Sequence, residues 1–194
     1  MPRVGIFGGT FDPPHVGHLL AAVDAAEALA LDRVLWIPAS TQPFKAARAD
    51  VAPADDRLAM TRRTIGADPR FSVDTVELDR GGLSYMVDTV RTLQQRDGRA
   101  EWFLLVGADA ARTLPQWREF DRLLTMVQVV AMARTAAGED LLLPSGVRQL
   151  DTRRVDLSST EIRQRVAGGR SIRGFVTDAV ADYITAAGLY RHGS

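Results

Sequence analysis

The 194-residue sequence has no cysteine, which excludes disulfide bonds, thiolate zinc sites, iron–sulfur clusters and a cysteine nucleophile. It has no excess charge of either sign, because 24 basic residues balance 24 acidic ones. It therefore gives no global reason to expect a nucleic-acid or membrane partner, although a local basic cleft stays open as an alternative. It also lacks an apolar run near the ~20 residues that span a bilayer, and its first residues lack the layout of a secretion signal. These absences favour a cytoplasmic protein.

Short apolar runs alternate with amphipathic stretches along the chain, which is typical of a parallel sheet wrapped by helices. The length favours a single domain over residues 1–194. Six runs without clean alternation are predicted as strands buried on both faces: Arg3–Gly8, Arg33–Ile37, Phe71–Val73, Trp102–Val106, Val127–Met132 and Val147–Leu150. Six stretches are predicted as helices: Val16–Ala30, Asp55–Ile65, Tyr85–Arg96, Trp117–Thr125, Ser159–Ala167 and Val176–Ala187, with Gly188 as the last C-cap. We expect a doubly wound α/β fold with a mainly parallel sheet of five to six strands and a small C-terminal helical part.

Two stretches, residues 38–53 and 136–145, are predicted as irregular. Ligands bind at the carboxyl ends of parallel strands in such sheets. The first stretch follows the second predicted strand and is therefore a candidate part of a binding site.

Residues 8–18 read Gly-Gly-Thr-Phe-Asp-Pro-Pro-His-Val-Gly-His and lie directly after the first predicted strand. Gly8 and Gly9 let the backbone approach a phosphate closely, because they carry no side chain. The two prolines after Asp12 force a turn, and the amides that open the following helix favour an anion. The spacing fits neither the Gly-x-x-x-x-Gly-Lys loop nor the Gly-x-Gly-x-x-Gly fingerprint. The segment predicts a phosphate-binding loop of another kind.

His15 and His18 are three residues apart, so they project to the same side of a first helical turn. They are two of the three histidines in the chain, and beside a phosphate loop they can donate hydrogen bonds to charge that builds up on phosphorus. In one alternative they only cap and pack the helix. In another they bind a metal, but no carboxylate or third histidine follows at helical spacing.

A second motif, Ser158-Ser159-Thr160-Glu161-Ile162-Arg163, lies far along the chain. Ser158 and Glu161 fit a helix capping box. The further hydroxyls and Arg163 at a helix start also fit a phosphate clamp. The capping interpretation explains only two of these residues, and both interpretations can hold together.

These two motifs together resemble the nucleotidyltransferase superfamily that is marked by a His-x-Gly-His motif, and within it the bacterial nicotinate mononucleotide adenylyltransferases. The resemblance follows the element order over nearly the whole chain. Further matches are Gly107-Ala108-Asp109 after the fourth predicted strand, Trp117 beyond it, and Ser84-Tyr85 with Val87-Asp88-Thr89.

The resemblance implies that the chain transfers the adenylyl group of ATP to nicotinate mononucleotide in NAD biosynthesis and releases pyrophosphate. It implies ATP and a pyridine mononucleotide as partners, and Mg²⁺ as a cofactor that ATP carries, without a metal site on the protein. Catalytic roles pass to His15, His18, Lys45 and Arg163. ATP-binding roles pass to Gly8, Gly9, Thr10, Phe11, Gly107, Asp109, Arg134, Ser158, Ser159 and Thr160. Acceptor-binding roles pass to Ser84, Tyr85, Met86 and Trp117, with Trp117 stacked on the pyridine ring.

The sequence departs from the family pattern at three positions. Phe44 stands where the family has His, and Met86 stands where it has a Thr that helps to recognise the nicotinate carboxylate. An Arg-Pro-Gly of the family appears only as Arg134-Thr135-Ala136. Two helix starts, at residues 84–87 and near Trp117, still offer amides and a positive dipole end to a carboxylate. We therefore expect a preference for the acid over the amide that is narrower than in relatives with Thr.

Several of these residues also have a purely structural interpretation. Trp117 fits a core position, Asp109 fits a helix cap, and Lys45 fits a solvated charge. Phe175, Tyr183 and Tyr190 are interpreted as packing residues only. Two other functions stay open, namely transfer to nicotinamide mononucleotide or another phosphate acceptor such as phosphopantetheine, and a nucleotide sensor without catalysis.

Overall fold

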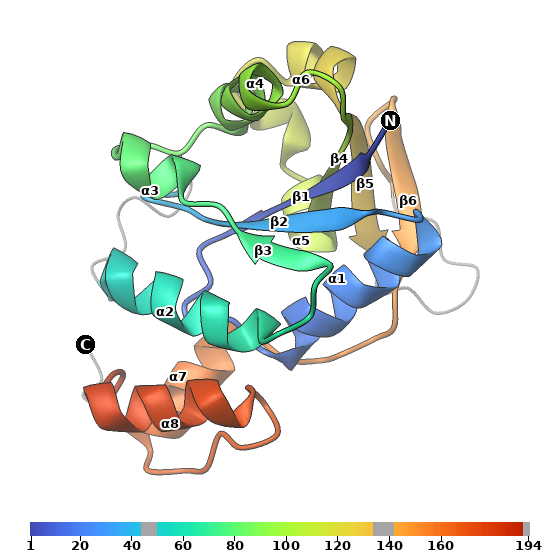
Figure 1. The fold of residues 1–194 in the computed structure, drawn as a ribbon. Coiled ribbons are helices and arrows are strands. Elements are labelled where there is room, and N and C mark those ends of the chain that lie inside the picture. Colours follow the sequence, from blue (N-terminus) through green and yellow to red (C-terminus); the bar gives the residue numbers. More distant parts are fainter. Residues whose placement is uncertain (44–49, 134–141, 192–194) are drawn as a thin grey trace.

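The computed structural model describes residues 1–43, 50–133 and 142–191. Within them, six strands form one sheet in the order β3-β2-β1-β4-β5-β6, and every neighbouring pair is parallel (Figure 1). The strands are β1 (Arg3–Gly9), β2 (Arg33–Pro38), β3 (Phe71–Val73), β4 (Glu101–Gly107), β5 (Gln128–Ala133) and β6 (Val147–Asp151). All six predicted strands are confirmed to within one residue at each end, and the doubly wound class is confirmed with them. The strand order reverses between β1 and β4, which is where such folds bind ligands.

Helices cover both faces of this sheet. The helices of the described residues are α1 (Val16–Ala28), α2 (Ala54–Ile65), α3 (Val76–Arg80), α4 (Met86–Arg96), α5 (Ala108–Ala111), a 3₁₀ turn (Leu114–Gln116), α6 (Phe120–Met126), α7 (Ser159–Ala167) and α8 (Asp178–Ala187). Figure 1 shows α4 and α6 on one side of the strands and α1 and α2 on the other. Two layers of helices around one sheet leave the carboxyl ends of the strands free for a site.

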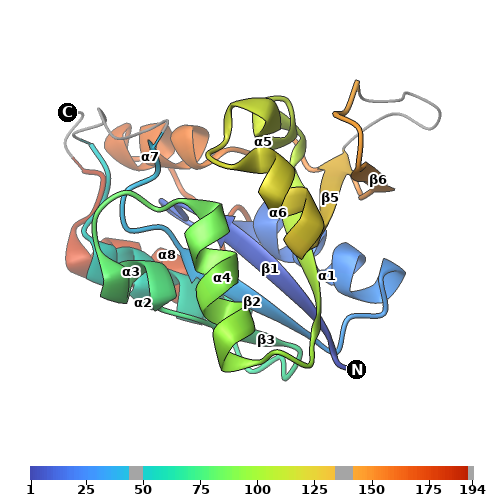
Figure 2. The same cartoon turned by 90° about the horizontal axis from the view of Figure 1, so that it is seen from above.

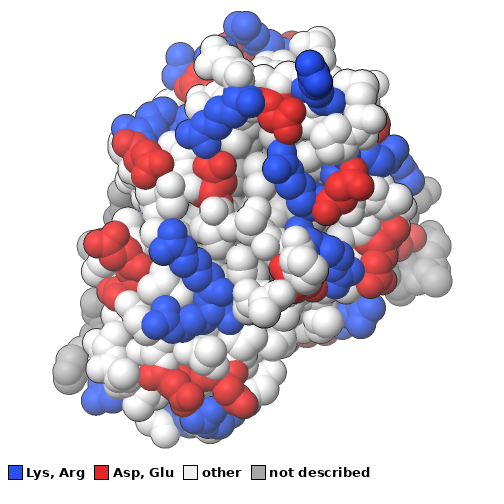
Figure 3. All heavy atoms as spheres, viewed as in Figure 1, with Lys and Arg blue, Asp and Glu red and all other residues white. Residues whose placement is uncertain are grey.

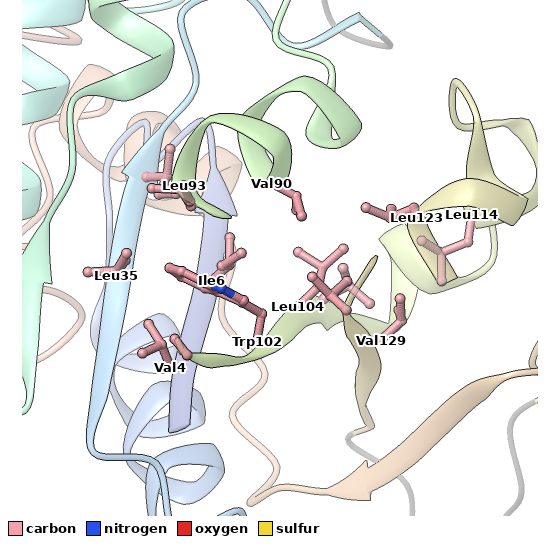
Figure 4. Packing of buried hydrophobic residues seen from close by; sticks show 14 of the residues in the cluster. Val4, Ile6, Leu35, Val90, Leu93, Trp102, Leu104, Leu114, Leu123 and Val129 are labelled. Atoms are coloured by element: carbon pink, nitrogen blue, oxygen red, sulfur yellow. The ribbon is translucent and has the colours of Figure 1, made fainter. Parts of the chain in front are cut away.

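Side chains alternate between two cores because successive strand residues point to opposite faces. Ile6 and Leu104 pack with Val90 and Leu123 under α4 and α6 (Figure 4). On the other face, aromatic and aliphatic side chains of the strands pack against the small residues of α1: Phe7, Val34, Trp36, Phe103 and Leu105 against Ala22, Ala25 and Ala26. The short alanines let α1 lie close to the central strands.

The C-terminal helices α7 and α8 pack on α2 and not on the sheet. Met60 of α2 shares a third apolar cluster with Ile162, Val180 and Ile184, and Figure 1 shows α8 below α2. Gly188 closes α8 in a left-handed conformation with φ of 66°, which confirms the predicted cap. The predicted C-terminal helical part is confirmed.

The sequence-based helices differ from the structure mainly around Trp117. The predicted helix over Trp117–Thr125 is wrong at its start, because Glu119 adopts a left-handed φ of 53° and α6 begins only at Phe120. The short helices α3 and α5 were not predicted, since four or five residues carry too little periodicity to be recognised. Among the described residues of the two irregular stretches, Pro38 ends β2, Thr41 makes an isolated bridge and Pro43 has 3₁₀ conformation, and the others form no helix or strand.

Candidate active site

Gly8 and Gly9 end β1 at the free carboxyl edge of the sheet. A Cβ atom on Gly8 would lie 2.8 Å from the Cε atom of Met86, and one on Gly9 would lie 3.0 Å from the ring of Phe11. Thr10 continues the loop and donates a hydrogen bond from Oγ1 to Oε1 of Gln42, at 3.0 Å. The strand end therefore stays open only because neither glycine carries a side chain.

Phe11 anchors this loop in the core. Its side chain is 2% exposed, meets the ring of Phe7 edge-on, and lies 5.4 Å from the ring of His18. Its φ of 52° turns the chain sharply towards Asp12. Because the ring is enclosed by the core, any contact of Phe11 with a nucleotide falls to its backbone.

The two predicted histidines stack on each other at the start of α1. Their ring centroids lie 3.7 Å apart. The Nδ1 atom of His18 accepts a hydrogen bond from the backbone amide of His15, at 3.2 Å. In a neutral imidazole the proton then sits on Nε2, so His18 offers an Nε2–H donor. His15 precedes the first residue of α1 and is 3% exposed, whereas His18 is partly exposed. His15 is therefore closely packed at the helix start, and His18 is the more accessible of the pair.

The second motif lies against the glycine-rich loop, although it is some 146 residues away in sequence. Figure 2 shows α7 beyond the end of β1. Ser159 donates to the carbonyl oxygen of Pro13 at 2.8 Å, and Arg163 donates to the carbonyl oxygen of Asp12 at 2.8 Å. Ser158 accepts from the amide of Glu161 at 3.1 Å, which confirms it as the N-cap. Thr160 accepts a longer bond from Arg163, at 3.3 Å. The motif thus fastens α7 to the loop.

Arg57 of α2 is a residue that the sequence analysis missed. It is 2% exposed and donates to four backbone carbonyl oxygens, those of Thr10, Ala39, Ser40 and Ala52. It therefore holds the loop after β1 and the loop after β2 together. Its position with Met60, Thr61 and Thr64 on the buried face of α2 was a readable signal, since a charged residue at an apolar period is unusual.

A cavity of about 370 Å³ opens beside Gly8 and Gly9, within the size range of small-molecule sites. Its walls come from the end of β1, the loop after β2, α3, the start of α4 and the segment around Trp117: Gly8, Gly9, Ala39, Gln42, Pro43, Glu77, Ser84, Tyr85, Met86, Gln116, Trp117 and Arg118. All four predicted acceptor-binding residues are among them. The structure thus brings the predicted acceptor residues next to the predicted phosphate loop.

Trp117 lies between the core and the cavity. It packs against the core cluster under α6, its indole Nε1 donates to Thr113 Oγ1 at 3.2 Å, and its side chain lines the cavity. The neighbouring Arg118 was missed; its guanidinium lies 4.8 Å from the centre of the Tyr85 ring. The expected second helix start at Trp117 is wrong, since α6 begins three residues later with Glu119 before it. The positive charge at this wall comes from Arg118 instead.

Glu77 of α3 is a buried carboxyl group in the cavity wall, with 2% exposure. Burial raises the pKa of Glu77, while hydrogen bonds from Thr89 and Ser84 and the charge of Arg80 oppose that rise. Ser84 in turn accepts from the amide of Ser40 at 3.0 Å. Glu77 thus holds the residue that joins the two sides of the cavity. The short α3 gave no sequence signal for it.

The remaining predicted residues lie apart from the cavity or outside the described residues. Gly107 ends β4, and Asp109 of α5 has a fully exposed side chain 3.0 Å from Arg112. Asp109 caps no helix, so the capping interpretation is wrong for it. Lys45, Phe44 and Arg134 lie outside the residues that the structure describes. Within the described residues no group of three or more His, Cys, Asp or Glu side chains could hold a metal ion.

A parallel sheet with the order 3-2-1-4-5-6, a glycine-rich loop at the switch point and a histidine pair on the following helix define a nucleotide-binding α/β protein of the nucleotidyltransferase kind. Residues 6–165 match the model of the cytidylyltransferase-like family. The chain belongs to this family.

Relatives match over nearly all of the chain. A protein of Gemmatimonas aurantiaca, named a probable nicotinate-nucleotide adenylyltransferase, is 55% identical over 97% of this chain and 92% of its own length. A Thermus thermophilus protein of the same name is 47% identical over 97% of this chain and its full length. Among solved structures, the Plasmodium falciparum nicotinic acid mononucleotide adenylyltransferase complexed with NaAD superposes with a TM-score of 0.80 at 15% identity. The superposition covers 100% of this chain and 99% of that one. At that identity the likeness shows the fold alone.

Proposed function

We propose that the chain is an enzyme that transfers the adenylyl group of ATP to nicotinate mononucleotide in NAD biosynthesis, giving nicotinate adenine dinucleotide and pyrophosphate. The observation that carries the proposal is that the predicted phosphate loop and the acceptor cavity share two residues. Gly8 and Gly9 belong both to the loop before the histidine pair and to the cavity lined by Tyr85, Met86 and Trp117. An acceptor in the cavity therefore places its phosphate beside the loop that receives the phosphates of ATP.

His18 is proposed to stabilise the transition state by donating from Nε2 to the α-phosphate. Its Nδ1 is already occupied by the amide of His15, at 3.2 Å, so no reorganisation of the ring is needed when charge develops. His15 is proposed to act on the neighbouring phosphates and, through the stacked rings, to hold His18 in place. Lys45 and Arg163 are proposed to hold the leaving pyrophosphate.

The reaction needs no general base from the protein. The acceptor is a phosphate monoester whose second pKa is ~6, so its oxygen is already ionised near neutral pH. The protein has to place this oxygen in line with the α-phosphorus and to offset charge. Mg²⁺ fits as an ion that arrives with ATP, since it keeps most of its water and needs few protein ligands; bound to the phosphates, it would neutralise their charge.

Three features of the cavity support the acid as acceptor. The helix α4 opens at Met86 after Tyr85, and no side chain caps its first amides. The positive dipole end there favours a carboxylate over a neutral amide. Arg118 adds a positive charge over the Tyr85 ring. Trp117 offers an aromatic surface on which a pyridine ring can stack.

A pyrophosphate-release assay tests the proposal. The protein is incubated with ATP, Mg²⁺ and, in turn, nicotinate mononucleotide, nicotinamide mononucleotide and phosphopantetheine. We expect the highest kcat/KM with nicotinate mononucleotide. A higher value with either of the other acceptors would assign a different substrate. Binding of ATP without pyrophosphate release from any of them would identify a nucleotide sensor and contradict the proposal.

A further inference from the structure

Asp12, directly before the two prolines of the loop, connects the phosphate loop to three distant parts of the chain. Its side chain is 2% exposed. The Oδ1 atom accepts from the phenol of Tyr190 at 2.7 Å and from the amide of Ala52 at 3.2 Å. Its carbonyl oxygen accepts from Arg163 of α7. Tyr190 is 178 residues away in sequence, so the end of the chain is bonded to its first loop.

The charge of the buried carboxylate is balanced from two sides. The Nη1 atom of Arg163 lies 3.7 Å from Oδ2 of Asp12, and Arg57 interacts electrostatically with the same carboxylate. Arg57 also binds the carbonyl oxygen of the preceding Thr10, at 3.0 Å. A buried charge is stable only when it is paired and hydrogen-bonded in this way. The loop is thus fixed by α2 and α7 as well as by the C-terminus.

Tyr190 is held in an unusual conformation to make this contact. Its φ is 60°, in the left-handed region that non-glycine residues rarely adopt. Such a conformation persists only when surrounding contacts maintain it. Burial and the nearby Asp12 carboxylate raise the pKa of the Tyr190 phenol. The phenol is therefore protonated near neutral pH and donates to Asp12. The expectation that Tyr190 only packs is wrong.

We propose that Tyr190 is a positioning residue for the reaction, which bonds Asp12 and so fixes residues 10–18, the part of the loop after β1, in the geometry that receives the ATP phosphates. This inference rests on the function proposed above. The acceptor cavity is held by other contacts. Gly8 and Gly9 lie within β1 and pair with β2, and Ser84 joins the two cavity walls through Ser40 and Thr41. Loss of the Tyr190 bond should therefore affect ATP and leave the acceptor site intact.

Tyr183 provides a matched control for the experiment. Its phenol donates to Oδ1 of Asp56 at 2.7 Å, so it makes the same kind of bond at the same distance. Asp56 lies on α2 and contributes neither to the loop nor to the cavity. Tyr190→Phe and Tyr183→Phe each remove one phenol–carboxylate bond from the C-terminal helical part. Only the first removes a bond to the loop.

The test measures Tm, kcat and both KM values for the full-length wild type and the two variants, varying ATP and nicotinate mononucleotide separately. We expect Tyr190→Phe to lower kcat/KM for ATP by about tenfold, the effect of one lost hydrogen bond to a charged group. The KM for nicotinate mononucleotide should not change. Tyr183→Phe should change neither kcat/KM for ATP nor the KM for nicotinate mononucleotide. Its Tm should fall by about as much as the Tm of Tyr190→Phe.

Equal kinetics in the two variants, with only a loss of Tm, would overturn the inference and leave Tyr190 as a structural residue. An equal rise in the KM for ATP and in the KM for nicotinate mononucleotide in Tyr190→Phe would overturn the inference as well. If the wild type releases no pyrophosphate with any acceptor, the proposed function fails separately. Calorimetric titration with ATP then tests the inference, which requires weaker ATP binding in Tyr190→Phe alone.

Discussion

At the scale of single residues, His18 joins an observed structural role to a proposed chemical one. Its Nδ1 closes the start of α1 by accepting from the amide of His15, and its partly exposed ring presents the other nitrogen. The rigid partner and the stacked ring fix the direction of the Nε2–H bond. A preorganised donor of this kind acts on the transition state more than on folding.

Replacing His18 by Ala should therefore lower kcat by about 10²–10³-fold, the usual effect of removing one preorganised donor. The Tm should change little, since His18 is only partly buried. Steady-state kinetics and a thermal melt of the same preparation measure both quantities. A His18→Ala variant with near-normal kcat would show that the histidine only caps the helix.

Met86 determines how strongly we expect nicotinate mononucleotide to be preferred over nicotinamide mononucleotide. Its side chain reaches Gly8 across the cavity and offers no hydroxyl to a carboxylate. Met86→Thr should widen the preference for nicotinate over nicotinamide mononucleotide by roughly tenfold to a hundredfold, because one added hydrogen bond to a charged group contributes ~1–3 kcal/mol. The ratio of kcat/KM for the two acceptors measures it. If the wild type prefers the amide, Met86 marks a changed specificity and the argument from the helix start fails.

At the scale of elements, the helices around the site differ in how they begin. Ser158 caps α7 through the amide of Glu161, whereas Thr177 stands at the same position of α8 and caps nothing. An N-cap side chain stabilises a protein by ~1 kcal/mol. The two positions therefore form a matched pair for testing the second motif.

Ser158→Ala should destabilise the fold by ~1 kcal/mol and lower the Tm by about 2–4 °C. Thr177→Ala should lower the free energy of unfolding by clearly less than Ser158→Ala does. Denaturant unfolding of both variants measures the difference, and equal losses would contradict the capping role. The KM for ATP of Ser158→Ala separates capping from a phosphate contact, because only a phosphate contact should raise it.

The α3 segment predicts a pH effect through Glu77. Burial raises the pKa of Glu77 in the folded protein above its unfolded value, which is ~4.3. The folded state thus binds the proton of Glu77 more tightly than the unfolded state does. The contribution of this proton to the free energy of unfolding is complete below the unfolded pKa and is lost as the pH rises through the folded pKa. Wild type should therefore lose stability relative to Glu77→Gln between pH 4 and neutrality. The difference in unfolding free energy between the two proteins is measured across this range. A difference that does not vary with pH would contradict the raised pKa of Glu77.

At the scale of the whole molecule, charges of both signs are distributed over the surface. Figure 3 shows Arg side chains interspersed with Asp and Glu on one face, in line with the equal totals of the sequence. Among the described helices none is both long and apolar enough to cross a bilayer.

Activity should depend strictly on a divalent cation that is added with ATP. The described residues contain no cluster of three metal-ligating side chains, and Mg²⁺ needs few protein ligands when phosphates supply oxygen. We expect chelation to abolish pyrophosphate release and excess Mg²⁺ to restore it. Metal analysis of the purified protein tests whether the protein itself holds a metal ion, since stoichiometric bound zinc would support a metal site at the histidine pair.

The sequence by itself determined the sheet and the chemistry of the loop. Continuous apolar runs located every strand within one residue, because strands buried on both faces must be apolar throughout. The glycines, prolines and histidines of residues 8–18 indicated a phosphate loop, since their properties act over a few neighbouring residues. Local patterns of this kind survive folding unchanged.

Only the tertiary structure decided which residues complete the site. Arg57, Glu77, Arg118 and Tyr190 reach their partners from other elements, and Tyr190 does so across 178 residues. No spacing in the sequence records such a contact, because it depends on how distant elements pack together, as α7 and α8 do against α2 and the loop after β1. Short elements such as α3 were missed for a related reason, since packing rather than periodicity stabilises a single helical turn. The sequence therefore encodes the proposed reacting groups locally, and the fold supplies the buried charges and hydrogen bonds that hold them in place.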